Sequence, residues 1–104
     1  MSDLKDRLRA DLTTAMKARE QLRASTLRMV LTAVTTAEVS GKEARELTDD
    51  DVLTVLTAEA KKRREAAAAF EDAGRVESAE KELAEAAVIA DYLPEQLDGE
   101  QISA

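Results

Sequence analysis

The chain contains no cysteine and no histidine, and these two absences exclude most of the chemistry that protein sites perform. Without cysteine there is no disulfide, no thiolate zinc site and no cysteine nucleophile. Without histidine there is no imidazole base for a Ser-His-Asp or Cys-His arrangement, and no ordinary transition-metal site. Only carboxylates, lysines, hydroxyls and Tyr92 remain for catalysis. We therefore expect no metal, no cofactor and no catalytic activity of the chain's own.

Proline and aromatic residues are also scarce, with one proline, one phenylalanine and one tyrosine in 104 residues. The chain has 20 alanines and 12 leucines, which favour helices, and few residues suited to a sheet. The length suits one domain and is too short for two. The composition predicts a single all-α domain, and we expect a monomer or a weak dimer.

The charge is unbalanced: 22 acidic residues oppose 15 basic ones and give a formal net charge of -7. A net acidic chain is repelled by nucleic acid and by anionic lipid, so binding to either needs a local basic patch. The N-terminus lacks the apolar stretch of a signal peptide, and no run approaches the length of a membrane span. These features predict a cytoplasmic protein with no membrane partner.

Apolar periodicity and end signals predict four helices, at roughly 3–18, 20–39, 49–72 and 76–92. The first has Leu8 at the centre of its apolar stripe, with Met16 at the end of that stripe, and Ser2 or Asp3 as N-cap. The second is apolar on two sides, so we expect it to be the central helix, with Leu31 in the core. Gly41 follows it, where a left-handed residue commonly ends a helix.

The third helix has the clearest start, because Thr48 and Asp51 form a capping box between the apolar Leu47 and Val52. We expect the fourth helix to bury a face that includes Ala79, Leu83 and Ala86, with its glutamates spaced around the surface. Pro94 ends that helix. The predicted domain covers 1–93. Residues 94–104 read as a linker and, from a second capping box at 98–101, as the start of a second helical domain that the chain does not supply.

Six basic residues carry the hypothesis of nucleic-acid binding: Arg19, Arg23, Arg28, Lys61, Lys62 and Arg64. The run at 61–64 encircles its helix rather than forming one patch, because consecutive residues point about 100° apart. A solvated face with local ion pairs, such as Glu59 with Arg63, is the plainer interpretation. A patch forms only if the arginines of the second helix gather beside the run. We expect Arg28 to pair with a carboxylate on the third or fourth helix.

Five segments stand together in the order and spacing of YqeY-like proteins: Ser25–Arg28, Leu47–Asp50, Lys61–Ala66, Ala73–Arg75 and Tyr92–Leu97. The chain therefore resembles the GatB/YqeY family over residues 3–103. Members of that family continue into a second, smaller helical domain, so the resemblance covers the N-terminal helical domain. It implies a relation to the tail of the B subunit of the tRNA-dependent amidotransferases, which is associated with holding tRNA. The resemblance also implies the activity of such enzymes, that of a carbon–nitrogen ligase with glutamine as amido-N-donor.

The residues themselves argue against that chemistry, because amide transfer needs a nucleophile, an ATP-phosphate site and Mg²⁺ ligands. The sequence has no Gly-rich loop, no cysteine and no ligand cluster. Two interpretations follow. The first is a non-catalytic accessory domain that binds tRNA, or components of the amidotransferase or a synthetase, through the six bases. The second is a protein-interaction scaffold that binds no nucleic acid, which the negative charge favours. Clustering of the six bases on one face supports the first, and their dispersal into ion pairs supports the second.

Overall fold

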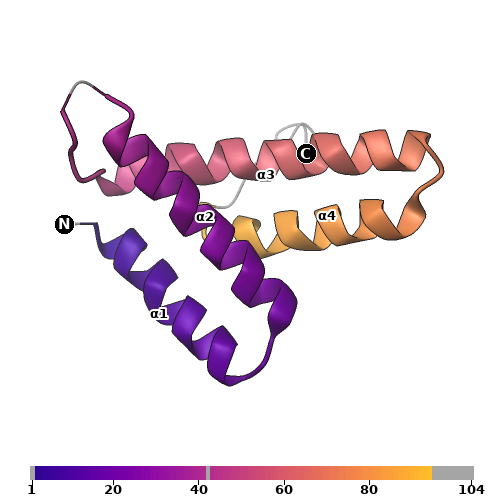
Figure 1. The fold of residues 1–104 in the computed structure, drawn as a ribbon, viewed down its shortest axis with the longest axis horizontal. Coiled ribbons are helices and arrows are strands. Elements are labelled where there is room, and N and C mark those ends of the chain that lie inside the picture. Colours follow the sequence, from indigo (N-terminus) through magenta and orange to yellow (C-terminus); the bar gives the residue numbers. More distant parts are fainter. Residues whose placement is uncertain (1, 42, 95–104) are drawn as a thin grey trace, which may run out of the picture.

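The computed structural model describes residues 2–41 and 43–94, and within these ranges the chain is all-α, as predicted, with no strand. Its helices are α1 (Asp3–Lys17), α2 (Gln21–Val39), α3 (Asp49–Asp72) and α4 (Val76–Ala90). They form two hairpins, α1 with α2 and α3 with α4, and the first hairpin lies obliquely across the second (Figure 1). The capping box predicted at 98–101 lies outside the described residues.

The predicted starts of α1 and α3 are confirmed. The Ser2 hydroxyl accepts the backbone N–H of Lys5 at 3.0 Å and caps α1. The Thr48 hydroxyl accepts the N–H of Asp51 at 3.2 Å, and the Asp51 carboxylate accepts the N–H of Thr48 at 3.3 Å. The flanking Leu47 and the helix residue Val52 are both buried. Local chemistry thus fixes where these two helices begin.

Helix α3 ends on Gly74, which has a positive φ of 76°. The N–H of Arg75 donates to the Phe70 carbonyl at 2.8 Å, and the N–H of Gly74 donates to the Glu71 carbonyl at 3.0 Å. This pair of bonds is the Schellman motif, which favours glycine because a left-handed residue is needed.

The expectation of the same conformation at Gly41 is wrong, since Gly41 has no positive φ. Helix α2 ends differently because the N–H of Arg45, from the returning loop, donates to the Glu38 carbonyl at 3.0 Å. That bond satisfies a carbonyl of the last helical turn without a left-handed residue.

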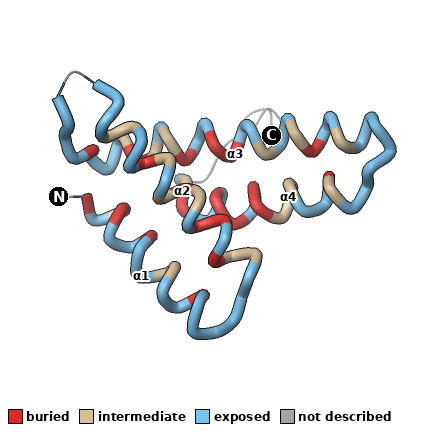
Figure 2. Tube along the Cα trace, in the orientation of Figure 1, coloured by how far each residue is buried: buried red, intermediate tan, exposed pale blue. Residues whose placement is uncertain are grey.

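Helix α2 contacts each of the other three helices, as expected of a central helix, but α3 does so too. Its Leu27, Val30 and Val34 are fully buried and belong to the main core cluster. Figure 2 places the buried residues on the sides where the helices face one another. Leu31 does not have the core position expected of it. It packs against the edge of the cluster and is only partly buried, because the deepest stripe of α2 runs 27–30–34.

The buried face of α4 also differs from the prediction. Ala79, Ala86 and Ile89 are buried, but Leu83 is 50% exposed and Glu85 is buried in its place. Residues three and four positions before Ile89 lie on its face of the helix, which brings Ala86 and Glu85 inward. The prediction that the glutamates of this helix lie on the surface is therefore wrong for Glu85.

Candidate functional site

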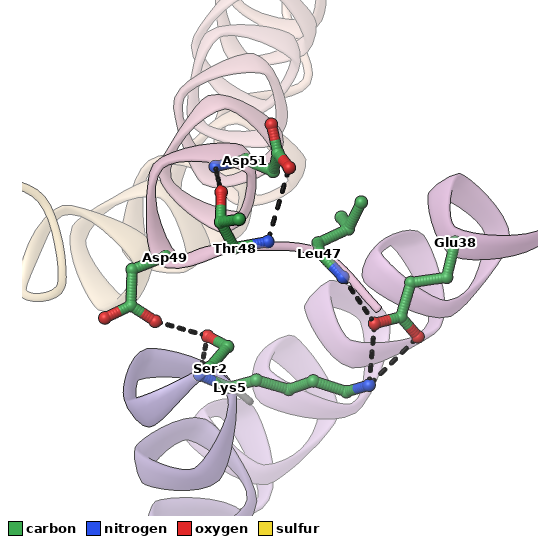
Figure 3. Close-up of polar contacts among 7 residues, drawn as sticks. All are labelled: Ser2, Lys5, Glu38, Leu47, Thr48, Asp49 and Asp51. Atoms are coloured by element: carbon green, nitrogen blue, oxygen red, sulfur yellow. Dashed lines mark hydrogen bonds and ion pairs between the residues drawn. The ribbon is translucent and has the colours of Figure 1, made fainter. Parts of the chain in front are cut away.

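A polar junction joins the start of α1 to the end of α2 and the start of α3 (Figure 3). Lys5 is 6% exposed, and its ammonium donates to both carboxylate oxygens of Glu38, at 2.8 and 2.9 Å. Glu38 also accepts the N–H of Leu47 at 3.1 Å. The Ser2 hydroxyl donates to Asp49 at 2.5 Å. Each of these polar groups forms a hydrogen bond to another segment of the chain, so the junction serves to hold the fold together.

The carboxylates of this junction are held in their charged form. The hydrogen bond from Lys5, followed by that from the Leu47 N–H, lowers the pKa of Glu38 below its usual value. The pKa of Asp49 is lowered by its hydrogen bonds, of which the one from Ser2 has the largest effect. Such carboxylates stabilise the fold at neutral pH rather than serving as proton donors.

Tyr92 anchors the chain after α4 to α1. Its hydroxyl donates to Asp11 at 2.5 Å, and the guanidinium of Arg7 lies 4.7 Å from the centre of its ring. Burial, together with the hydrogen bond to Asp11, raises the pKa of Tyr92 far above its usual value. The hydroxyl therefore stays protonated, which suits a packing role.

Of the six predicted bases, two are engaged by carboxylates within the described residues. Arg23 pairs with Asp91 at 3.3 Å and lies 3.9 Å from Glu20, and Lys62 pairs with Glu59 at 3.2 Å. The remaining bases make no ion pair within the described part of the chain: Arg19, Arg28, Lys61 and Arg64. Arg19 and Arg28 belong to the first hairpin, and Lys61 and Arg64 lie on α3, where the neighbouring Arg63 contacts Met29 of α2.

Two predicted ion pairs are wrong. Arg28 has no carboxylate from the described parts of α3 or α4. It is Arg23, five residues earlier, that meets Asp91, because Arg23 lies on the face of α2 that is directed toward the end of α4. Glu59 pairs with Lys62 rather than with Arg63. Arg63 instead points inward, where its Nε lies 3.6 Å from Glu82 and its Nη1 donates to the sulfur of Met29 at 3.4 Å.

A groove runs between the end of α1 and the first two turns of α2. Its volume is about 410 Å³, and its apolar lining comes from Ala15, Met16 and Ala24. Arg19 and Arg28 also line it, so the structure brings these two predicted bases to one feature. Met16, which the periodicity assigns to the apolar stripe, is 53% exposed here. The reason is its place at the edge of the stripe of α1, whose centre is Ala15 at this level.

Arg19 lies in an unusual backbone conformation at the turn between α1 and α2. Its φ is 60°, the left-handed region, and it is the one residue other than glycine in the described ranges with a positive φ. The N–H of Glu20 donates to the Ala15 carbonyl at 2.9 Å and that of Arg19 to the Met16 carbonyl at 3.2 Å. These bonds form a second Schellman motif, with arginine in the position that Gly74 takes after α3.

A pair of carboxylates between α3 and α4 was not predicted from the sequence. Glu85 is 8% exposed, and burial followed by the charge of Glu82 raises its pKa. One carboxylate oxygen of each glutamate is buried without a hydrogen bond to the described residues. Glu85 and Glu82 stand four and seven positions before Ile89, and this helical spacing is the one sequence signal that places both glutamates on the inner face.

No three acidic residues of the described ranges gather as ligands for a metal ion. In the same ranges, none of the helices combines the length and the apolar character that crossing a bilayer requires.

Comparison with known proteins identifies the family. A family model described as Yqey-like protein matches residues 5–104. An uncharacterized protein of Schizosaccharomyces pombe is 39% identical over 88 residues, which cover 85% of this chain and 70% of the yeast protein. Nearly the whole chain is matched, which bears out the resemblance found in its motifs. The chain belongs to the YqeY-like protein family.

Proposed function

We propose that the chain is a non-catalytic accessory domain that acts by binding a protein component of the tRNA-dependent amidotransferase machinery. The relation to the tail of an amidotransferase subunit comes from the resemblance of the five sequence segments. The observation that carries the binding role is the groove between α1 and α2, where exposed Met16 lies with two arginines that make no ion pair with the described residues. The accessible side chain of Met16 and the two cations together offer a partner both apolar contact and ion pairing.

A protein partner fits the distribution of charge better than tRNA does. Of the six bases, Arg23 and Lys62 are already paired with carboxylates, which leaves four for contacts with phosphates. The net charge of -7 opposes the approach of a polyanion. Aromatic side chains on which bases stack are nearly absent from the sequence.

Binding of tRNA is the second candidate, and the four bases without ion pairs in the described ranges favour it. If all four contact phosphates, the slope of log affinity against log salt is about -3 to -4. The affinity at physiological salt is then in the non-specific range, near 10⁻⁴–10⁻⁶ M. Because Arg23 and Lys62 are held by carboxylates, reversing their charge tests this candidate less well than reversing Arg28 and Arg64.

The experiment is calorimetric titration of the chain with purified tRNA-dependent amidotransferase, and in parallel with tRNA over a range of salt concentrations. We expect saturable binding to the enzyme, and weak binding to tRNA that salt abolishes. We also expect that the chain alone hydrolyses neither glutamine nor ATP. Tight tRNA binding without enzyme binding would replace the proposal by the second candidate. Turnover that persists through repurification would refute a non-catalytic role.

A further inference from the structure

The groove between α1 and α2 has two kinds of surface that a single ligand must match. Its accessible apolar surface is the half-exposed side chain of Met16, beside the buried Ala15 and Ala24. Methionine is flexible and polarisable, so it adapts to different apolar partners. Arg19 and Arg28 add two exposed positive charges to the same groove.

The lining of the groove has more basic than acidic residues, on a chain that is acidic as a whole. The chain carries seven more acidic than basic groups, and its other arginine nearby, Arg23, is occupied by Asp91 and Glu20. Glu20 also lines the groove, but it lies 3.9 Å from that same Arg23. Arg19 and Arg28 are therefore the groove's cations without an ion pair in the described ranges, and acidic groups complement them.

The backbone at Arg19 gives an independent reason to regard its side chain as functional. A left-handed φ is unfavourable for a residue with a Cβ, and the chain uses glycine in the equivalent position after α3. Arginine occupies the first turn although glycine fits its backbone better. Unfavourable conformations of this kind concentrate where a side chain serves a ligand.

The dimensions of the groove indicate the form of the ligand. Along α2 it runs from Gln21 to Arg28, seven residues or about 10 Å. Two turns of a partner helix have the same length, with apolar residues at three- and four-residue spacing for the apolar lining. Acidic residues beside that apolar face then complement Arg19 and Arg28.

We infer that this groove receives an acidic amphipathic helix of a partner protein. This inference rests on the proposed function, because it names the chemistry of the segment through which the partner binds.

The probe for the test is a fluorescent amphipathic peptide of about 18 residues, with leucines on one face and glutamates beside them. A control peptide has lysine in place of every glutamate. The first protein variant combines Arg19→Ala and Arg28→Ala. The matched control combines Lys61→Ala and Arg64→Ala, which removes the same charge from exposed residues of α3. A third variant, Met16→Asp, changes the apolar lining at a half-exposed site.

We expect the acidic peptide to bind the unaltered chain and the lysine peptide not to bind. The groove double variant should weaken binding about tenfold, Met16→Asp by a similar factor, and the α3 double variant less than about twofold. Equal losses in the two double variants, or equal binding of both peptides, would overturn the inference. If the groove double variant loses tRNA binding but still binds the peptide, the groove is a nucleic-acid site and the inference is wrong. If purified amidotransferase binds the chain but ignores the Arg19→Ala and Arg28→Ala changes, the groove inference fails and the proposed function stands.

Discussion

Replacing Arg19 by glycine should stabilise the protein, although it removes a charged side chain from the surface. At φ 60° a residue with a Cβ costs about 1–2 kcal/mol relative to the right-handed conformation, and glycine avoids this cost. Glycine in turn makes the unfolded chain more flexible, which offsets about 0.4–1 kcal/mol. Arg19 makes no ion pair with the described residues, so none is lost. The expected net gain is about 0.5–1 kcal/mol.

The assay is equilibrium unfolding in urea, followed by circular dichroism because the protein is helical and has no tryptophan. Arg19→Ala is the control, since it removes the guanidinium but keeps the Cβ, and its stability should be near that of the unaltered chain. Gly74→Ala is the converse, and should cost about 1 kcal/mol. A Cβ at Gly74 meets no atom within 4 Å, so its cost is conformational alone. If Arg19→Gly is no more stable than Arg19→Ala, the left-handed assignment is wrong.

Further substitutions test the packing and the electrostatics. Leu27→Ala should cost about 2–5 kcal/mol in urea unfolding because Leu27 is fully buried, and Leu31→Ala should cost clearly less; the reverse order would contradict the described core. Thr48→Ala should lower the free energy of unfolding by about 1 kcal/mol, and an unchanged urea midpoint would mean that α3 is not capped there. Glu85→Gln should stabilise the protein at pH 7. The raised pKa of Glu85 means that its ionised form destabilises the fold above the folded pKa, and that this effect disappears below the usual value of 4.5. The advantage of the Glu85→Gln variant over the unaltered chain should therefore fade as the pH falls toward that value, and an advantage that grows on acidification would refute the assignment. Glu38→Gln should have the opposite sign, since the lowered pKa of Glu38 stabilises the fold above pH 4.5 and that stabilisation is lost as the pH falls.

The features that the sequence predicts well are those encoded within a few neighbouring residues. The capping box of Thr48 and Asp51 uses groups three positions apart, so its chemistry is visible in the sequence. The same holds for the apolar periodicity that predicts the four helices. The predicted helix ends agree with the structure within two residues for this reason.

The features that were mispredicted depend on contacts between helices. The alanine-rich α4 gives a weak signal for its buried face, because alanine fits an interior or a surface position. Its orientation follows instead from Ile89 and from Tyr92, which bonds to Asp11 of α1. Likewise, whether Arg23 or Arg28 meets a carboxylate depends on where α4 ends relative to α2.

The candidate site could be predicted in part. Arg19 and Arg28 are among the six bases selected from the sequence, and the structure brings them to one groove. The groove itself could not be predicted, because it needs Met16 to remain exposed at the tip of the first hairpin. The positive φ of Arg19 could not be predicted either, since no glycine or asparagine marks that turn.

The central claim, that the chain acts by binding a partner at the groove between α1 and α2, is tested most directly by mapping the contact surface. Nitrogen–proton correlation spectra of the isotope-labelled chain, recorded during titration with purified tRNA-dependent amidotransferase, report on each backbone amide. We predict that the largest changes fall on residues 15–28, which include the lining of the groove. Changes concentrated on α3 and α4, or spectra that do not change at all, would contradict this claim.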